Sequence, residues 1–216
     1  MRKEREEEIK YLGQLKELIG LNREFDIIDL FVQLHPADIA DLIDNLEEQE
    51  KIHLFSLLDV EKASDVIPEL SDISREQILE DMSDTKLAEI IDEMDSDDAA
   101  DVIAELTEEQ ARAVLDEIEP EESEDLKELL KYDEESAGGI MQSELVSVLE
   151  TANVRDAVNA VINISDEIEN IYNVFVVNDA GVLIGTIPLQ KLIIAKRNDA
   201  IIETIDKSIP SVDVDV

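Results

Sequence analysis

The sequence predicts a mainly α protein, in which a right-handed superhelix of short helices is followed by a small α/β module. The first ground is an apolar position that returns every twelve residues without a change of phase. These positions are Leu34, Leu46, Leu58, Leu70, Met82, Met94, Leu106, Ile118 and Leu130. The second ground is a change, after residue 139, to short apolar runs rich in Val and Ile. A fixed period is typical of stacked repeats, and an irregular helical bundle is the alternative.

Two helices are expected before the repeats. An apolar stripe runs along residues 2–19 at helical spacing, and Gly20 is suited to end this first helix. A second helix is expected near residues 23–33, from which the chain enters the first repeat.

Each twelve-residue unit predicts one short helix and a turn, because its apolar residues fall on one face of a 3.6-residue helix. Side chains that can cap a first helical turn precede five of these helices: Asp59, Ser71, Ser83, Asp95 and Thr107. A helix of about nine residues is unstable alone in water. The units are therefore expected to stack as 24-residue helical hairpins, which complete an acidic superhelical domain over residues 1–131.

A polar linker and an α/β module are expected after the repeats. Residues 132–139 form the linker, which ends in two glycines, and the module covers residues 140–205. Its expected elements are a strand near 145–148, a helix at 154–162, a strand at 171–177, a turn at 178–181, a strand at 182–187 and a helix at 189–195. The remaining residues, 206–216, resemble the first strand of a second, truncated module.

The charge of the chain limits its partners. The net charge is −38, and residues 34–131 alone hold 33 acidic and 7 basic residues. Such a surface repels nucleic acid and anionic lipid and attracts cations. There is no Cys, and the only histidines, His35 and His53, lie in different repeats and form no catalytic motif. No apolar stretch approaches the ~20 residues of a membrane span. The chain is therefore expected to be soluble and not an enzyme.

The densest group of carboxylates lies between residues 92 and 101. It is not an EF-hand, because the sixth position counted from Asp95 is Ala100 instead of glycine. Asp97 and Asp101 are four residues apart and share one helix face. Carboxylates without Cys or His suit Mg²⁺ or Ca²⁺, and Mg²⁺ usually takes only one or two carboxylates together with several waters. A partly hydrated Mg²⁺ site is one interpretation, and an acidic face that only contacts solvent is the other.

Three segments make the sequence similar to a known family. They are Leu34-His-Pro-Ala-Asp-Ile-Ala-Asp-Leu-Ile, Met94-Asp-Ser-Asp-Asp-Ala-Ala-Asp-Val-Ile and Tyr132-Asp-Glu-Glu-Ser-Ala-Gly-Gly-Ile-Met. They resemble the cytosolic part of the MgtE family of magnesium transporters. The resemblance implies a superhelical N domain and a CBS (cystathionine-β-synthase-type) motif on the cytoplasmic side of the cell membrane. A second CBS motif, a connecting helix and a five-helix membrane pore are implied beyond residue 216.

The resemblance also implies a function and a set of metal ligands. Carboxylates of the N domain and the CBS domain hold Mg²⁺ in this family, and the matching positions here are Asp97, Asp101 and Asp65. Mg²⁺ binding then closes the pore by feedback, and the CBS module forms a homodimer. Lys191 stands where nucleotide-binding CBS motifs carry an Asp that contacts ribose, which argues against such a contact here. The alternative is a soluble scaffold of the same two parts that binds a partner protein.

Overall fold

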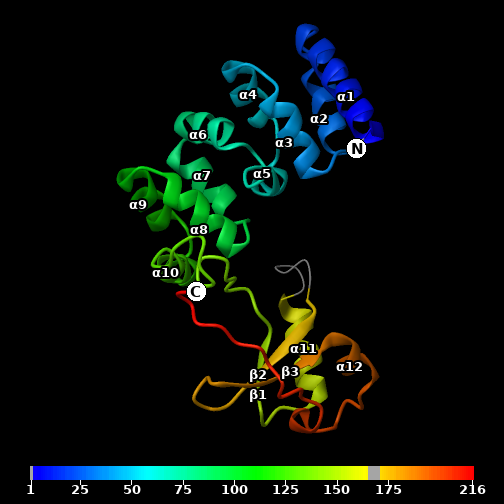
Figure 1. Ribbon diagram of the computed structural model, residues 1–216, viewed down its shortest axis with the longest axis vertical. Helices are drawn as coiled ribbons and strands as arrows, with labels where there is room; N and C mark the ends of the chain where they lie inside the picture. The colour runs from blue at the N-terminus through cyan, green and yellow to red at the C-terminus, as the bar shows by residue number, and fades with distance from the viewer. Residues whose placement is uncertain (1, 165–170) are drawn as a thin grey trace. The chain divides into compact units, whose positions relative to one another are not determined.

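The computed structural model describes residues 2–164 and 171–216. It divides into two compact units, Met1–Lys131 and Tyr132–Val216 (Figure 1). Each unit has a hydrophobic core of its own. The mainly helical fold with a small α/β module, which the sequence predicts, is confirmed.

The first unit consists of short helices after a longer first one. α1 (Arg2–Gly20) and α2 (Glu24–Phe31) precede the repeats. The repeats then form α3 (Pro36–Asp44), α4 (Glu48–Phe55), α5 (Val60–Val66), α6 (Asp72–Asp81), α7 (Asp84–Ile91), α8 (Ser96–Glu105), α9 (Glu108–Glu117) and α10 (Pro120–Leu129). Each of these eight helices begins twelve residues after the previous one. The apolar period therefore marks the helix starts directly.

The starts of the repeat helices are fixed by local chemistry. Asp59, Ser83 and Thr107 each accept a hydrogen bond from the backbone N–H three residues later, which satisfies a donor that the first turn leaves open. Ser71 also precedes its helix, but its hydroxyl donates across the array to Asp44 Oδ1 at 2.8 Å. One predicted cap is thus used for packing between helices.

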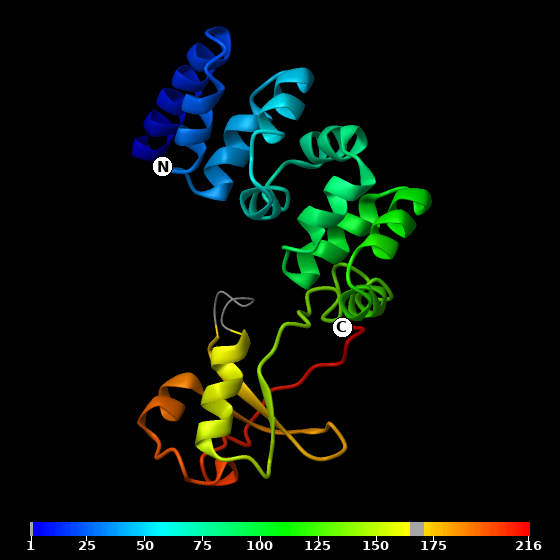
Figure 2. The ribbon, with the colours of Figure 1, turned by 180° about the vertical axis from the view of Figure 1, so that it is seen from behind.

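Alternate helices of the array pack on each other, which makes the 24-residue hairpin the structural repeat. α3 contacts α5, α5 contacts α7, and α7 contacts α9; likewise α4 contacts α6, and α8 contacts α10. The odd helices thus form one row from α3 to α9, and the even helices form two packed pairs, α4 with α6 and α8 with α10. Figure 2 shows the same helices from the opposite side. Fully buried aliphatic side chains fill the space between them, among them Ile39, Ile43, Leu54, Ile67, Leu87 and Ile91. Stacking supplies the stability that so short a helix lacks alone.

The second unit is a three-stranded sheet with helices. Its elements are β1 (Ser147–Leu149), α11 (Val154–Ile164), β2 (Asn173–Val177), β3 (Leu183–Pro188), α12 (Leu189–Ile194) and the 3₁₀ helix η1 (Ile201–Glu203). β2 lies in the centre, parallel to β1 and antiparallel to β3. The parallel pair requires a crossover, which α11 begins. The antiparallel pair is joined by a turn in which Asn178 Oδ1 accepts from two backbone N–H groups and Gly181 has a φ of +76°.

The linker and the tail differ from their expected forms. Residues 207–216 contain no strand; instead the carbonyls of Val214 and Val216 accept from the N–H groups of Gly138 and Ala137 at 2.9 and 2.8 Å. The expected strand is wrong because Asp206 alone pairs with the sheet, through Thr186. The linker is a folded turn, in which a Cβ on Gly139 would collide with the carbonyl oxygen of Asp133. Its glycines serve this close approach.

Candidate functional site

The candidate site is built on the first two turns of α8. Asp95 stands at the N-cap position of this helix, but its side chain makes no capping hydrogen bond. Asp97 and Asp98 lie in the first turn, and Asp101 follows one turn after Asp97. Asp97, Asp98 and Asp101 are all half-buried, so these carboxylates are packed against protein on one side and accessible on the other. Acidic residues suit a helix N-terminus because they face the positive end of its dipole. The i, i+4 spacing keeps Asp97 and Asp101 on one face, as the sequence predicts.

Negative charge is concentrated enough there to change the ionisation of one residue. The pKa of Asp98 is raised from 3.8 to about 6, first by burial and then by the neighbouring charges of Asp97, Asp95, Asp101 and Glu69. Burial disfavours the charged carboxylate, and each like charge disfavours it further. The start of α8 is therefore a place of strong negative potential, which a cation would relieve.

A basic residue contacts the other end of the same helix. Arg75, on α6, donates from Nε to both carboxylate oxygens of Glu105 at 2.9 Å, and its side chain is only 17% exposed. This hydrogen bonding raises the pKa of Arg75, and the charge of Asp101 also contributes to the rise. Arg75 therefore lies within the electrostatic reach of the Asp97–Asp101 face and joins α6 to α8.

Arg75 is a residue that the sequence reasoning missed. A signal for it existed, since Arg75 is the fourth residue of α6 and Lys51 is the fourth residue of α4. Lys51 is buried and donates to Ser74 Oγ, on α6, at 2.7 Å. Residues 34–131 hold only seven basic residues, and two of them, Lys51 and Arg75, share one repeat position. This repetition indicates that a basic side chain at this position connects one even helix to the next.

The third predicted ligand, Asp65, belongs to another part of the array. It is exposed on α5, which packs between α3 and α7, whereas α8 packs on α10. Among residues 2–164 and 171–216, no three His, Cys, Asp or Glu side chains form a group that could hold a metal ion. The structure therefore keeps Asp97 and Asp101 together but does not gather Asp65 with them into such a group.

The arrangement that remains fits a hydrated divalent cation. Mg²⁺ commonly binds through one or two carboxylates and retains several waters, which is the donor set that a half-buried pair such as Asp97 and Asp101 offers. The histidines are elsewhere: His35 directly precedes α3, and His53 Nε2 lies 3.3 Å from Glu24 Oε1. In the part of the chain that the structure describes, no helix has the length and hydrophobicity needed to cross a membrane.

Similarity to known proteins covers both units. Residues 34–135 match the family model of the MgtE intracellular N domain. A magnesium transporter MgtE of Enterococcus faecalis is 38% identical over 90 residues, which are 42% of this chain and 20% of that protein. The matched segment thus spans about a fifth of the length of that relative.

Two crystal structures extend the similarity to nearly the whole chain. The soluble part of a magnesium transporter is 28% identical with a TM-score of 0.81, over 96% of this chain and 82% of that one. The cytosolic domain of the Mg²⁺ channel MgtE in complex with ATP is 26% identical with a TM-score of 0.85, over 94% and 84%. Residues 34–135 therefore match the MgtE intracellular N domain, and the chain as a whole resembles the cytosolic parts of magnesium transporters.

Proposed function

We propose that this chain is the Mg²⁺-sensing regulatory region of a magnesium transporter. The observation that carries the proposal is the half-buried Asp97–Asp101 pair beside Asp98, whose pKa is raised to about 6. The similarity to cytosolic parts of magnesium transporters gives the ion and the setting. The pore that such a region would control lies outside this sequence and is part of the proposal.

The mechanism follows from charge. Residues 34–131 have a net charge of −26, and residues 132–216 have a net charge of −10. Asp97 and Asp101 would hold Mg²⁺ in the N domain, and the family resemblance implies acidic partners from the CBS domain. The bound ion supplies two positive charges that offset the repulsion between these carboxylates. A conformation in which the carboxylates share the ion is then favoured by its greater affinity for Mg²⁺, and its population rises. In the whole transporter this conformation closes the pore when Mg²⁺ is abundant.

The double substitution Asp97→Asn and Asp101→Asn tests the proposal. It removes two charges that repel each other, so the variant should melt at a higher temperature than the parent without Mg²⁺. The parent should gain about 1.4 kcal/mol of stability at a Mg²⁺ concentration ten times its Kd, and the variant should lose most of this gain. Thermal melts of both proteins across a Mg²⁺ titration at constant ionic strength provide the measurement.

A matched control separates Mg²⁺ binding from general screening. Glu121 and Asp125 are also four residues apart on one helix, α10, and both are exposed. The double substitution Glu121→Gln and Asp125→Asn should leave the response to Mg²⁺ as it is in the parent. If both double variants respond as steeply as the parent, the α8 cluster is an ordinary solvated face, and a scaffold function becomes the better interpretation.

A further inference from the structure

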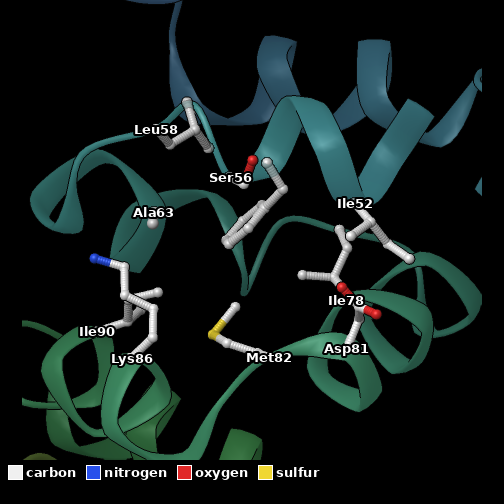
Figure 3. A pocket seen from close by; sticks show the side chains of 10 residues that line it. Ile52, Ser56, Leu58, Ala63, Ile78, Asp81, Met82, Lys86 and Ile90 are labelled. Carbon is white, nitrogen blue, oxygen red and sulfur yellow. The ribbon is translucent and has the colours of Figure 1, made fainter. Parts of the chain in front are cut away.

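The repeat array contains a cavity that the Mg²⁺ proposal does not use. It has a volume of about 250 Å³ and lies between α4, α5, α6 and α7 (Figure 3). Its wall is largely apolar and includes Phe55, Ala63, Ile78, Met82 and Ile90. An engineered apolar cavity of about 150 Å³ in another protein is known to bind benzene, so this space is large enough for a ring or a branched alkyl group.

The cavity has an identifiable cause in the repeat sequence. Ala63 is the fourth residue of α5, and the fourth residues of α3 and α7 are Ile39 and Leu87. Both of these larger side chains are fully buried. At Ala63 the array thus lacks the branched side chain that fills the same repeat position on either side. Alanine returns at this position at the end of the odd row, as the half-buried Ala111 of α9.

The polar groups at the cavity favour a positively charged ligand. Asp81, at the end of α6, is exposed, and Figure 3 shows its carboxylate at the edge of the cavity. Lys86 also lines the cavity, but its Nζ is paired with Glu89 Oε2 at 3.2 Å. Residues 34–131 have a net charge of −26, which raises the local concentration of cations and lowers that of anions.

We propose that this cavity is a binding site for a small organic cation with an apolar body, such as a primary amine attached to a ring. The body occupies the space beside Ala63, and the ammonium group lies at the rim, near the Asp81 carboxylate. Burial of the body supplies most of the affinity, and the charge selects amines over neutral and anionic molecules of the same shape. This site is independent of the Mg²⁺ proposal, since none of its lining residues belongs to α8.

Titration of the full chain with three probes of similar shape tests the ligand class. Benzylamine, benzyl alcohol and benzoate carry the same ring with a positive, neutral or negative group. Calorimetry should show benzylamine binding about twofold to fivefold more tightly than benzyl alcohol, which is the effect of one exposed ion pair, and benzoate binding more weakly than the alcohol. Asp81→Asn should remove the preference for the amine and leave the affinity for benzyl alcohol unchanged. Equal affinities for the amine and the alcohol in the parent would overturn the assignment of the ligand class.

Filling the cavity tests its location. Ala63→Leu should abolish benzylamine binding and raise the melting temperature, because it restores the side chain that Leu87 provides one repeat later. Ala111→Leu makes the same change at the fourth residue of α9, outside the cavity, and should leave binding unchanged. Binding of benzylamine to a folded Ala63→Leu variant as tightly as to the parent, or its absence in the parent, overturns the proposed site.

Discussion

The two units differ in how completely they bury their own apolar residues. The helical array stacks its aliphatic side chains into one continuous core that extends from Leu15 to Leu129. The α/β unit has a small core and leaves large apolar side chains exposed: Ile140, Tyr172, Ile193 and Ile194. Ile194 is 84% exposed. The array also exposes single apolar side chains such as Phe25, Val32 and Ile73. For its size, however, the module presents more apolar surface of the kind that binds a partner.

Core truncation should separate the two units most strongly. Leu54 is fully buried in the array, and Leu54→Ala should reduce the free energy of unfolding by about 2–5 kcal/mol through lost burial and the cavity left behind. Ile194→Ala, in the module, should change it by less than about 0.5 kcal/mol. Urea denaturation of both variants measures the difference. Equal losses would mean that the exposed module surface is needed for folding.

Removal of the Arg75–Glu105 pair should weaken the array locally, between α6 and α8. The backbones of α6 and α8 come close at fewer points than those of α4 and α6 or α8 and α10, and the Arg75–Glu105 pair connects them. Arg75→Met should cost about 1–1.5 kcal/mol through the lost hydrogen bonds, because Glu105 is exposed and water can replace its donor. Hydrogen exchange should then increase in α6 and α8 before it does in α3. Uniform exchange across the array would contradict the local role of Arg75.

The exposed face of the module should mediate self-association. We expect the chain to form dimers through residues 140–205, because large apolar side chains there are exposed in the part of the unit that the structure describes. Ile194→Lys should raise the dimer dissociation constant by about tenfold or more, measured by sedimentation equilibrium. Phe25→Lys is the matched control, since Phe25 is 86% exposed on α2 in the array. A larger effect of Phe25→Lys would place the dimer contact in the array instead.

The ionisation of Asp98 should have the smallest effect on the free energy of unfolding, and this effect should be confined to the array. Its folded pKa of about 6 lies above its ordinary value of 3.8, so the folded state binds the proton more tightly than the unfolded state. Stability should therefore rise as the pH falls from 7 towards 4. Asp98→Asn should stabilise the protein at pH 7 by at most about 1 kcal/mol, because the group is only half-buried, and should flatten this rise. Asp125→Asn, at an exposed carboxylate, should leave the pH profile unchanged.

The sequence predicts what is local and misses what depends on stacking. The helix starts and the caps Asp59, Ser83 and Thr107 follow from the twelve-residue period, and the shared face of Asp97 and Asp101 follows from helix geometry. The period alone does not show that alternate helices pack. Asp65 lies 36 residues before Asp101, which is one and a half hairpins. Asp65 is therefore on an odd helix, α5, whereas Asp101 is on an even helix, α8, and these two helices do not pack as alternate neighbours.

The sequence also does not predict which residues of distant repeats contact each other. Arg75 and Glu105 are 30 residues apart, and the charge of Glu69, outside the helix of Asp98, contributes to the raised pKa of Asp98. The tail was misjudged for a related reason. Alternation of Val and Asp is compatible with a strand, but a strand also needs a partner along its length. Asp206 alone pairs with the sheet, and Val214 and Val216 pair with the linker instead.

The alternate packing of the helices has a mechanical consequence. Most helices in this array pack on the helix two places away in the sequence. We therefore expect a displacement of one helix to pass to that partner more readily than to the next helix in the chain. α8, which carries Asp97 and Asp101, rests on α10, and α10 ends two residues before Lys131, the last residue of its unit. We therefore expect a displacement of the acidic turn of α8 to reach α10, and with it the chain segment that leaves the array, more directly than it reaches the odd helices.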